Sequence, residues 1–207
     1  KNLLNKCDHV IINPVIGQKK SGDVNYIFLN KIYDYLINKR YKNKVNAMDW
    51  AKNIGYDLAY LAPGFRIPSF SFVTQEGDSV NSSTLIGKPY ILEITPVASR
   101  LYQNQYDRTM VIHQIYQNYD LEIFTIPLDR SEVTVNAFFN ERVKHWGVAA
   151  FGSFDIQELI QKFNVTDVPT RILVDQNGNI VRKYVTTEFT DVIQGMNTVV
   201  NQSKNQN

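Results

Sequence analysis

The feature of the sequence that most constrains its fold is a predicted β-hairpin near the carboxyl end. An apolar run from Arg171 to Val174 is separated from a second run, Asn179 to Val185, by the turn Asp175-Gln176-Asn177-Gly178. An Asn-Gly pair between two apolar runs is a strong hairpin signal, because both residues accept the positive φ of a tight turn. A closing helix is predicted after the hairpin, since apolar residues recur there at helical spacing: Phe189, Val192, Ile193, Met196 and Val200.

Upstream of the hairpin, the pattern predicts a β-α-β unit. Tyr90 to Ile94 is a short apolar run with one acid, as in a buried strand, and Leu121 to Leu128 has the same character. A helix over about Arg100 to Tyr119 separates the two runs. Parallel strands joined by a helix and followed by a hairpin indicate an α/β fold, in which helices flank a central mixed β-sheet.

The first sixty residues differ from the rest and predict a helical hairpin. One helix is expected over Tyr26 to Arg40, and a second, with Ala51 and Leu58 on its apolar face, ends before Pro63-Gly64. We therefore divide the chain into an N-terminal helical extension, residues 1–62, and a main domain, residues 63–207.

Composition excludes several classes of partner. The net charge is +2 and the sequence has no long basic run, so nucleic acid is not an expected partner. No apolar stretch reaches the roughly 18 residues of a membrane span. The first residue is Lys1 and not Met, which suggests a processed precursor, with membrane anchoring outside the given chain as one option.

The segment from Pro63 onward resembles the thioredoxin-like proteins of the TlpA and AhpC/TSA group. The resemblance rests on Ser69-Phe70-Ser71-Phe72, on Leu85-Ile86-Gly87-Lys88-Pro89 and on Val168-Pro169-Thr170. It implies a thioredoxin-like fold in which Pro169 follows a cis peptide bond and faces the active-site loop.

The same resemblance places Ser99 and Tyr102 at the two positions where the family carries its redox cysteines. The only cysteine among the 207 residues is Cys7, so neither a Cys-x-x-Cys pair nor a peroxidatic and resolving pair can form within this chain. We predict no catalytic residue. The degenerate active-site positions are Ser99, Tyr102, Glu93 and Pro169.

Two of these positions leave alternatives open. Ser99 could act as a nucleophile, but His113 lies about four turns along the predicted helix, so we favour a helix cap. The resemblance gives an acid at the position of Glu93 a role in proton transfer beneath the cysteines. Without thiols, we expect a buried carboxylate paired with a neighbouring donor.

No metal or other cofactor is predicted. Cys7 and His9 form a Cys-x-His pair, but two ligands without a third are weak support for a metal site.

We expect a redox-inactive protein that binds another protein within a bacterial cell-envelope assembly. The envelope placement, periplasmic or membrane-anchored, comes from the resemblance. The expected partner-binding residues are Arg100, Tyr102 and Val168 near the old active site, or Tyr35 and Tyr41 on the helical hairpin. Tyr102 could instead fill the old site as core. The alternative functions are a thiol-disulfide oxidoreductase or peroxiredoxin-like enzyme that uses Cys7 or a partner's thiol, and a small-molecule carrier.

Overall fold

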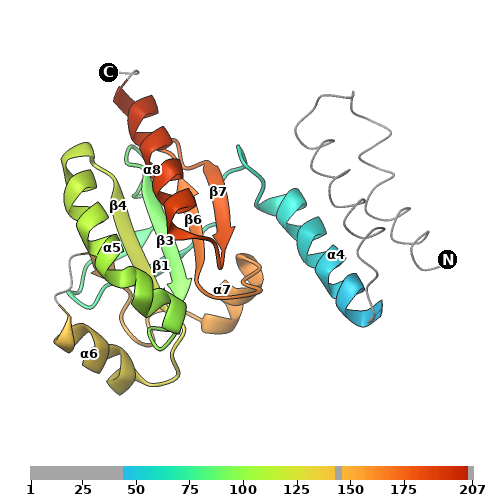
Figure 1. Ribbon diagram of the computed structural model, residues 1–207, viewed down its shortest axis with the longest axis horizontal. Coiled ribbons are helices and arrows are strands. Elements are labelled where there is room, and N and C mark those ends of the chain that lie inside the picture. Colours follow the sequence, from blue (N-terminus) through green and yellow to red (C-terminus); the bar gives the residue numbers. More distant parts are fainter. Residues whose placement is uncertain (1–43, 143–145, 205–207) are drawn as a thin grey trace. The chain divides into compact units, whose positions relative to one another are not determined.

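The computed structural model describes residues 44–142 and 146–204 of the chain (Figure 1). The chain divides into two compact units, Lys1–Ala59 and Tyr60–Asn207. In the first unit the structure describes helix α4 (Lys44–Tyr60), which is the second helix predicted for the extension. The first predicted helix lies outside the described residues, as do Tyr35, Tyr41, Cys7 and His9.

A five-stranded mixed sheet forms the centre of the second unit, in the order β5-β4-β3-β6-β7. The central strand β3 runs parallel to β4, which runs parallel to β5, whereas β6 is antiparallel to both β3 and β7. These strands span Tyr90–Thr95 (β3), Glu122–Pro127 (β4), Gly147–Val148 (β5), Thr170–Val174 (β6) and Ile180–Val185 (β7). The predicted mixed sheet flanked by helices is confirmed.

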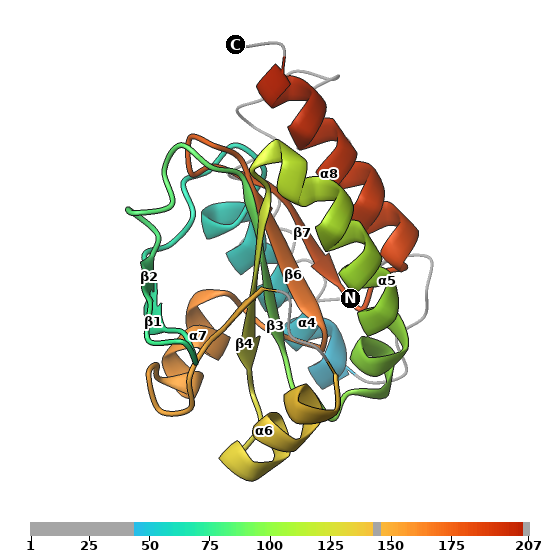
Figure 2. The same cartoon turned by 90° about the vertical axis from the view of Figure 1, so that its left-hand side faces the viewer.

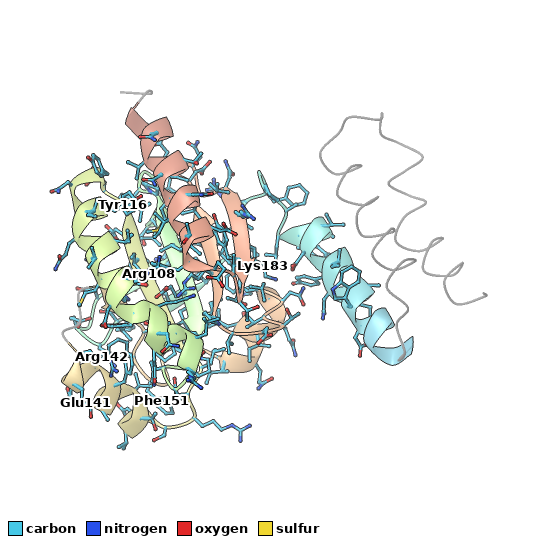
Figure 3. The ribbon with its side chains drawn as sticks, viewed as in Figure 1. Arg108, Tyr116, Glu141, Arg142, Phe151 and Lys183 are labelled. Carbon is cyan, nitrogen blue, oxygen red and sulfur yellow. The ribbon has the colours of Figure 1, made fainter. Side chains whose placement is uncertain are left out.

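Two long helices, α5 (Arg100–Tyr116) and α8 (Phe189–Lys204), cover one face of this sheet (Figure 2). The predicted helix after β3 ends at Tyr116 and continues as the short 3-10 turn η2 (Gln117–Tyr119). Two contacts tie α5 to α8: the Tyr116 hydroxyl donates a hydrogen bond to Asn197 Oδ1, and the Arg108 guanidinium lies 5.6 Å from the centre of the Phe189 ring (Figure 3). Helix α6 (Glu132–Glu141) adds Val135, Phe138 and Phe139 to the same core.

The opposite face of the sheet carries an aromatic layer. This face is covered by the hairpin of β1 (Ser71–Val73) and β2 (Ser79–Asn81) and by helix α7 (Ile156–Lys162) (Figure 2). The rings contact one another with centroids 6.0 to 6.3 Å apart. Stacked and edge-on pairs at this spacing add stability beyond the area that they bury. We define the aromatic layer as Phe70, Phe72, Tyr90, Phe124 and Phe163.

The predicted hairpin forms between β6 and β7. The Gly178 amide donates to Asp175 O at 3.0 Å, and Gly178 has a φ of 79°, the left-handed conformation that the Asn-Gly signal predicted. The hairpin begins at the Val168-Pro169 bond, which is cis. The cis bond expected from the family resemblance is therefore confirmed.

Candidate functional site

The loop between β3 and α5, residues 96–99, lies where the parallel strands end. Hydrogen bonds to the loop after β4 hold it in place. The Val97 amide donates to Asp129 Oδ2 at 2.7 Å, and the Leu128 amide donates to Thr95 O at 3.1 Å. From α5, Gln103 Nε2 donates to Val97 O at 3.0 Å. Asp129 is buried, so its bond to Val97 is shielded from water. The loop that leads to Ser99, the first of the two positions matched to redox cysteines, is therefore a fixed turn.

Ser99 stands at the start of α5 and caps it. Its Oγ accepts a hydrogen bond from the Tyr102 amide at 3.4 Å, and its carbonyl accepts one from the Gln103 amide at 2.9 Å. Within the described part of the chain, the Ser99 hydroxyl has no other hydrogen-bond partner, and therefore no base to activate it. The geometry agrees with the predicted cap.

Tyr102 fills the core under α5. Its side chain has 0% exposure, and its ring lies 5.9 Å from the rings of both Tyr106 and Phe138. Burial, and secondly the negative charge of Glu93, raise the pKa of the Tyr102 phenol well above its usual value. This location corrects the prediction of Tyr102 as a partner contact, because a fully buried ring has no surface to offer. It agrees with the alternative that Tyr102 occupies the old active site as core.

Beneath the loop, Glu93 forms a buried ion pair with Arg171. Arg171 Nε donates to Glu93 Oε1 at 2.6 Å, and both side chains are 1% exposed. The second carboxylate oxygen, Oε2, accepts a hydrogen bond from Thr125 Oγ1 at 3.0 Å. The three residues are register neighbours on adjacent strands, with Glu93 opposite Thr125 on β4 and opposite Arg171 on β6. Glu93 is thus the paired, buried carboxylate that the sequence predicted.

Helix α5 and the segment after α6 complete this group of polar side chains. Arg171 Nη1 donates to Gln105 Oε1 at 2.8 Å, and Trp146 Nε1 donates to Thr125 Oγ1 at 2.8 Å. The Arg171 guanidinium also lies 5.3 Å from the centre of the Phe189 ring, within range of a cation–π contact. We call this group the polar cluster, and it consists of Glu93, Arg171, Thr125, Gln105 and Trp146.

The polar cluster leaves Glu93 little scope for chemistry. Both of its oxygens are held by donors on neighbouring strands, and its partner cation is permanently charged. The sequence pattern did not single out Arg171 as a partner of Glu93, although one signal was present. Glu93 and Arg171 are opposite charges, each set within an apolar strand, and such residues are seldom buried unless they are paired.

Val168 and Arg100 remain accessible, the first just before β6 and the second at the start of α5. Val168 is half-buried, and its amide donates to Asp167 Oδ1 at 2.8 Å, while the buried Pro169 accepts a hydrogen bond from the Thr186 amide. Arg100 is exposed at the first turn of α5.

The described residues offer no centre for a metal ion. Residues 44–142 and 146–204 contain no group of three or more His, Cys, Asp or Glu side chains arranged to hold one. In the same ranges, no helix combines the length and the apolar character that crossing a membrane requires.

Residues 91–180 match the family model described as thioredoxin-like. Over this stretch the chain has a thioredoxin-like fold. Its sequence is similar to the thiol-disulfide oxidoreductase ResA of Bacillus thuringiensis and of Bacillus anthracis, with 21% identity over 132 residues in each case. Each match covers 64% of this chain and 75% of the relative.

Solved structures confirm the fold. The thioredoxin domain of a thiol-disulfide oxidoreductase from Bacteroides vulgatus matches with a TM-score of 0.61 at 19% identity, over 67% of this chain and 98% of that one. A thiol:disulfide interchange protein from Bacteroides sp. matches with a TM-score of 0.60 at 19% identity, over 68% and 91% of the two chains. These proteins are named for thiol chemistry, whereas this thioredoxin-like domain has no cysteine of its own.

Proposed function

We propose that this chain is a redox-inactive thioredoxin-like protein that binds another protein, as a component of a bacterial cell-envelope assembly. The observation that carries the proposal is the structural use of both cysteine positions. Ser99 caps α5 and Tyr102 fills the core. A thiol exchange needs an accessible sulfur nucleophile, and neither position supplies one.

The polar cluster supports the same proposal. In the family to which the resemblance points, an acid at the Glu93 position exchanges protons with the cysteines. In this chain the carboxylate is held by Arg171 and Thr125. This chain thus lacks both the cysteines and a free carboxylate for proton transfer. That combination favours a structural site over an enzyme that obtains a thiol from Cys7 or from a partner.

The proposed partner surface is the edge of the old active site, where Arg100 and Val168 are accessible. Thioredoxin-like folds can hold an extended peptide through backbone hydrogen bonds at this edge, and such contacts do not require cysteines. Tyr35 and Tyr41 of the N-terminal extension remain a second proposed surface. The envelope location rests on the similarity to ResA and the interchange proteins.

The second candidate function is a thiol-disulfide oxidoreductase that uses Cys7 or a partner's thiol. The names of the relatives favour it. An insulin-reduction assay and a peroxide-consumption assay separate the two, with Cys7→Ser as the matched control. We expect background rates from both proteins. Turnover in the wild type that disappears in Cys7→Ser would overturn the first proposal in favour of the second.

The binding part of the proposal needs its own test. Partners cross-linked in intact cells should be recovered with the wild type and reduced with Arg100→Ala. Arg182→Ala is a suitable control, because Arg182 is also exposed and lies on the edge strand β7. Equal recovery with both variants would contradict the placement of the partner at this edge.

A further inference from the structure

In strand β1, the backbone N–H and C=O groups of Ser71 make no hydrogen bond to β2. Phe70 O accepts a hydrogen bond from the Ser82 amide at 3.1 Å, and Phe72 is paired with Val80, so residues 70 and 72 face β2. Alternate residues of an antiparallel strand turn their N–H and C=O groups to opposite sides, and Ser71 therefore faces away from β2. Among the described residues, neither backbone group of Ser71 has a hydrogen-bond partner.

The neighbouring positions that face the same way are occupied. Ser69 O accepts a hydrogen bond from Lys162 Nζ at 3.0 Å. Val73 O accepts one from the Ala150 amide at 2.7 Å and another from Ser153 Oγ at 3.1 Å. Ser71 therefore has unbonded backbone groups on this edge, whereas the carbonyl groups of Ser69 and Val73 on either side already accept hydrogen bonds. This is enough for one residue of an added strand and too little for an edge-to-edge sheet.

Ser71 opens onto a groove of about 300 Å³ between β1 and α7, which we call the β1–α7 groove. Its lining includes the buried side chains of Phe70 and Leu159, together with polar side chains from the segment before α7. The ring of Phe70 lies edge-on to Phe163 at 6.1 Å, and this contact holds the end of α7 against the strand. The walls of the groove are thus fixed by the aromatic layer.

The charge of the groove favours a cation. Asp155 Oδ1 caps α7 by accepting hydrogen bonds from the Gln157 and Glu158 amides at 2.8 and 3.0 Å. Asp155 Oδ2 has no partner among the described residues. The other acid, Glu158, is paired with Lys162 at 2.5 Å, so one carboxylate oxygen of the groove is left for an incoming positive charge.

We propose that the β1–α7 groove binds an extended, basic segment of another protein. One residue of that segment exchanges two backbone hydrogen bonds with Ser71, and a neighbouring Lys or Arg side chain pairs with Asp155. Strand β1 and helix α7, which line the groove, lie on the face of the sheet opposite α5 and α8 (Figure 2), so the proposal does not depend on the partner surface at Arg100.

The test uses the whole chain, labelled with ¹⁵N, and a defined probe, the peptide acetyl-Thr-Val-Lys-Val-Thr-amide. The same peptide with Glu in place of Lys serves as the control. We expect the lysine peptide to shift the amide signals of Ser71, Ser153 and Asp155, with a Kd of about 1 mM, because so few contacts give weak binding. The glutamate peptide should leave these signals in place.

Two variants test separately the backbone hydrogen bonds of Ser71 and the negative charge of Asp155. Ser71→Pro removes the outward N–H without cutting the β1–β2 ladder, and it should weaken binding by about tenfold. Asp155→Asn keeps an oxygen that can cap α7 but removes the charge, and it should weaken binding about threefold and reduce its salt dependence. Ser71→Ala keeps the backbone groups and should bind as the wild type does. Thermal melts check that Ser71→Pro folds, and Asp155→Asn tests the groove in either case.

Three results would overturn the proposal. The first is equal binding of the glutamate and lysine peptides, and the second is unchanged binding by a folded Ser71→Pro and by Asp155→Asn. The third is a shift of the same three amides when the protein alone is concentrated, which would assign the groove to a second copy of this chain. The absence of any shift at about 10 mM lysine peptide would count against it equally.

Discussion

The two faces of strand β3 pack against different kinds of side chains. Ile91, Glu93 and Thr95 point toward α5 and α8, where Glu93 joins the polar cluster. Tyr90, Leu92 and Ile94 point to the other face, where Tyr90 belongs to the aromatic layer. Both faces are buried, yet only one holds charged side chains. One face packs aromatic rings against β3, whereas the other holds a buried ion pair beneath the loop between β3 and α5.

A buried ion pair is weak support for stability, because removing two charges from water costs about as much as their attraction returns. The aromatic layer buries no charge and gains from every ring that it buries. Its one polar cost is the Tyr90 hydroxyl, which is buried without a hydrogen-bond partner among the described residues. The polar cluster does specify one register. A slip of β6 by one residue would turn Arg171 toward the aromatic layer and leave both charges unpaired. We infer that the cluster selects the alignment of β3, β4 and β6, while the aromatic layer supplies most of the stability.

The largest effect that we predict is for breaking the ion pair. Arg171→Leu leaves Glu93 buried without its cation and should lower the free energy of unfolding by about 3 to 5 kcal/mol, measured by urea denaturation. Glu93→Leu combined with Arg171→Leu should recover most of that loss, because no unpaired charge remains. Arg182→Leu is the matched control on β7. Its side chain is exposed and its guanidinium lies 5.0 Å from the centre of the Tyr184 ring, so the change in stability should be less than about 1 kcal/mol. A loss below about 1 kcal/mol in Arg171→Leu would contradict the contrast between the two faces.

The next prediction concerns the aromatic layer. A Cβ at Gly147 would lie 2.9 Å from Phe124 Cδ1, closer than the packed ring can accept. Gly147→Ala should therefore destabilise the fold by about 1 to 3 kcal/mol. Adding Phe124→Leu should make the double variant more stable than the sum of the two single effects, since the smaller side chain makes room. Simple additivity in urea denaturation would show that the layer is loose at this point.

The sequence predicted the features that depend on residues close together in the chain. It did not predict the features that depend on residues far apart. The β3, β4, β6 and β7 strands and helices α4, α5 and α8 were predicted because their patterns are local. Helix α7 has only seven residues, too few for a clear period, and it was not delimited. The site shows the same division. The Ser99 cap depends on the next three residues, whereas the Glu93 to Arg171 pair joins positions 78 apart in sequence. The burial of Tyr102 likewise depends on Phe138 of α6, which no local pattern near Tyr102 reveals.

A smaller effect is expected at the cap. Ser99→Ala should lower stability by about 0.5 kcal/mol, at the low end for caps because the Oγ to Tyr102 amide distance is 3.4 Å. Ser99→Asp should restore the loss, since Asp is also a good cap. A fluorophosphonate probe should label neither the wild type nor Ser99→Ala, because Ser99 has no base partner within the described part of the chain. Labelling of the wild type alone would assign Ser99 a nucleophilic role.

The smallest effect is the pH dependence that arises from two phenols packed beside the polar cluster. Burial, and secondly the charge of Glu93, raise the pKa of Tyr106 to about 12, and the pKa of Tyr102 is raised for the same two reasons. Above pH 10 the unfolded chain has begun to lose these phenolic protons while the folded chain still holds them, so stability must fall as the pH rises. This contribution is fully present below about pH 10 and is lost as the pH approaches the folded pKa values. Urea midpoints measured between about pH 9 and pH 11 should therefore decrease, and the decrease should be shallower in Tyr102→Phe and in Tyr106→Phe. An unchanged slope in both variants would mean that neither phenol is as buried as its place beside the polar cluster requires.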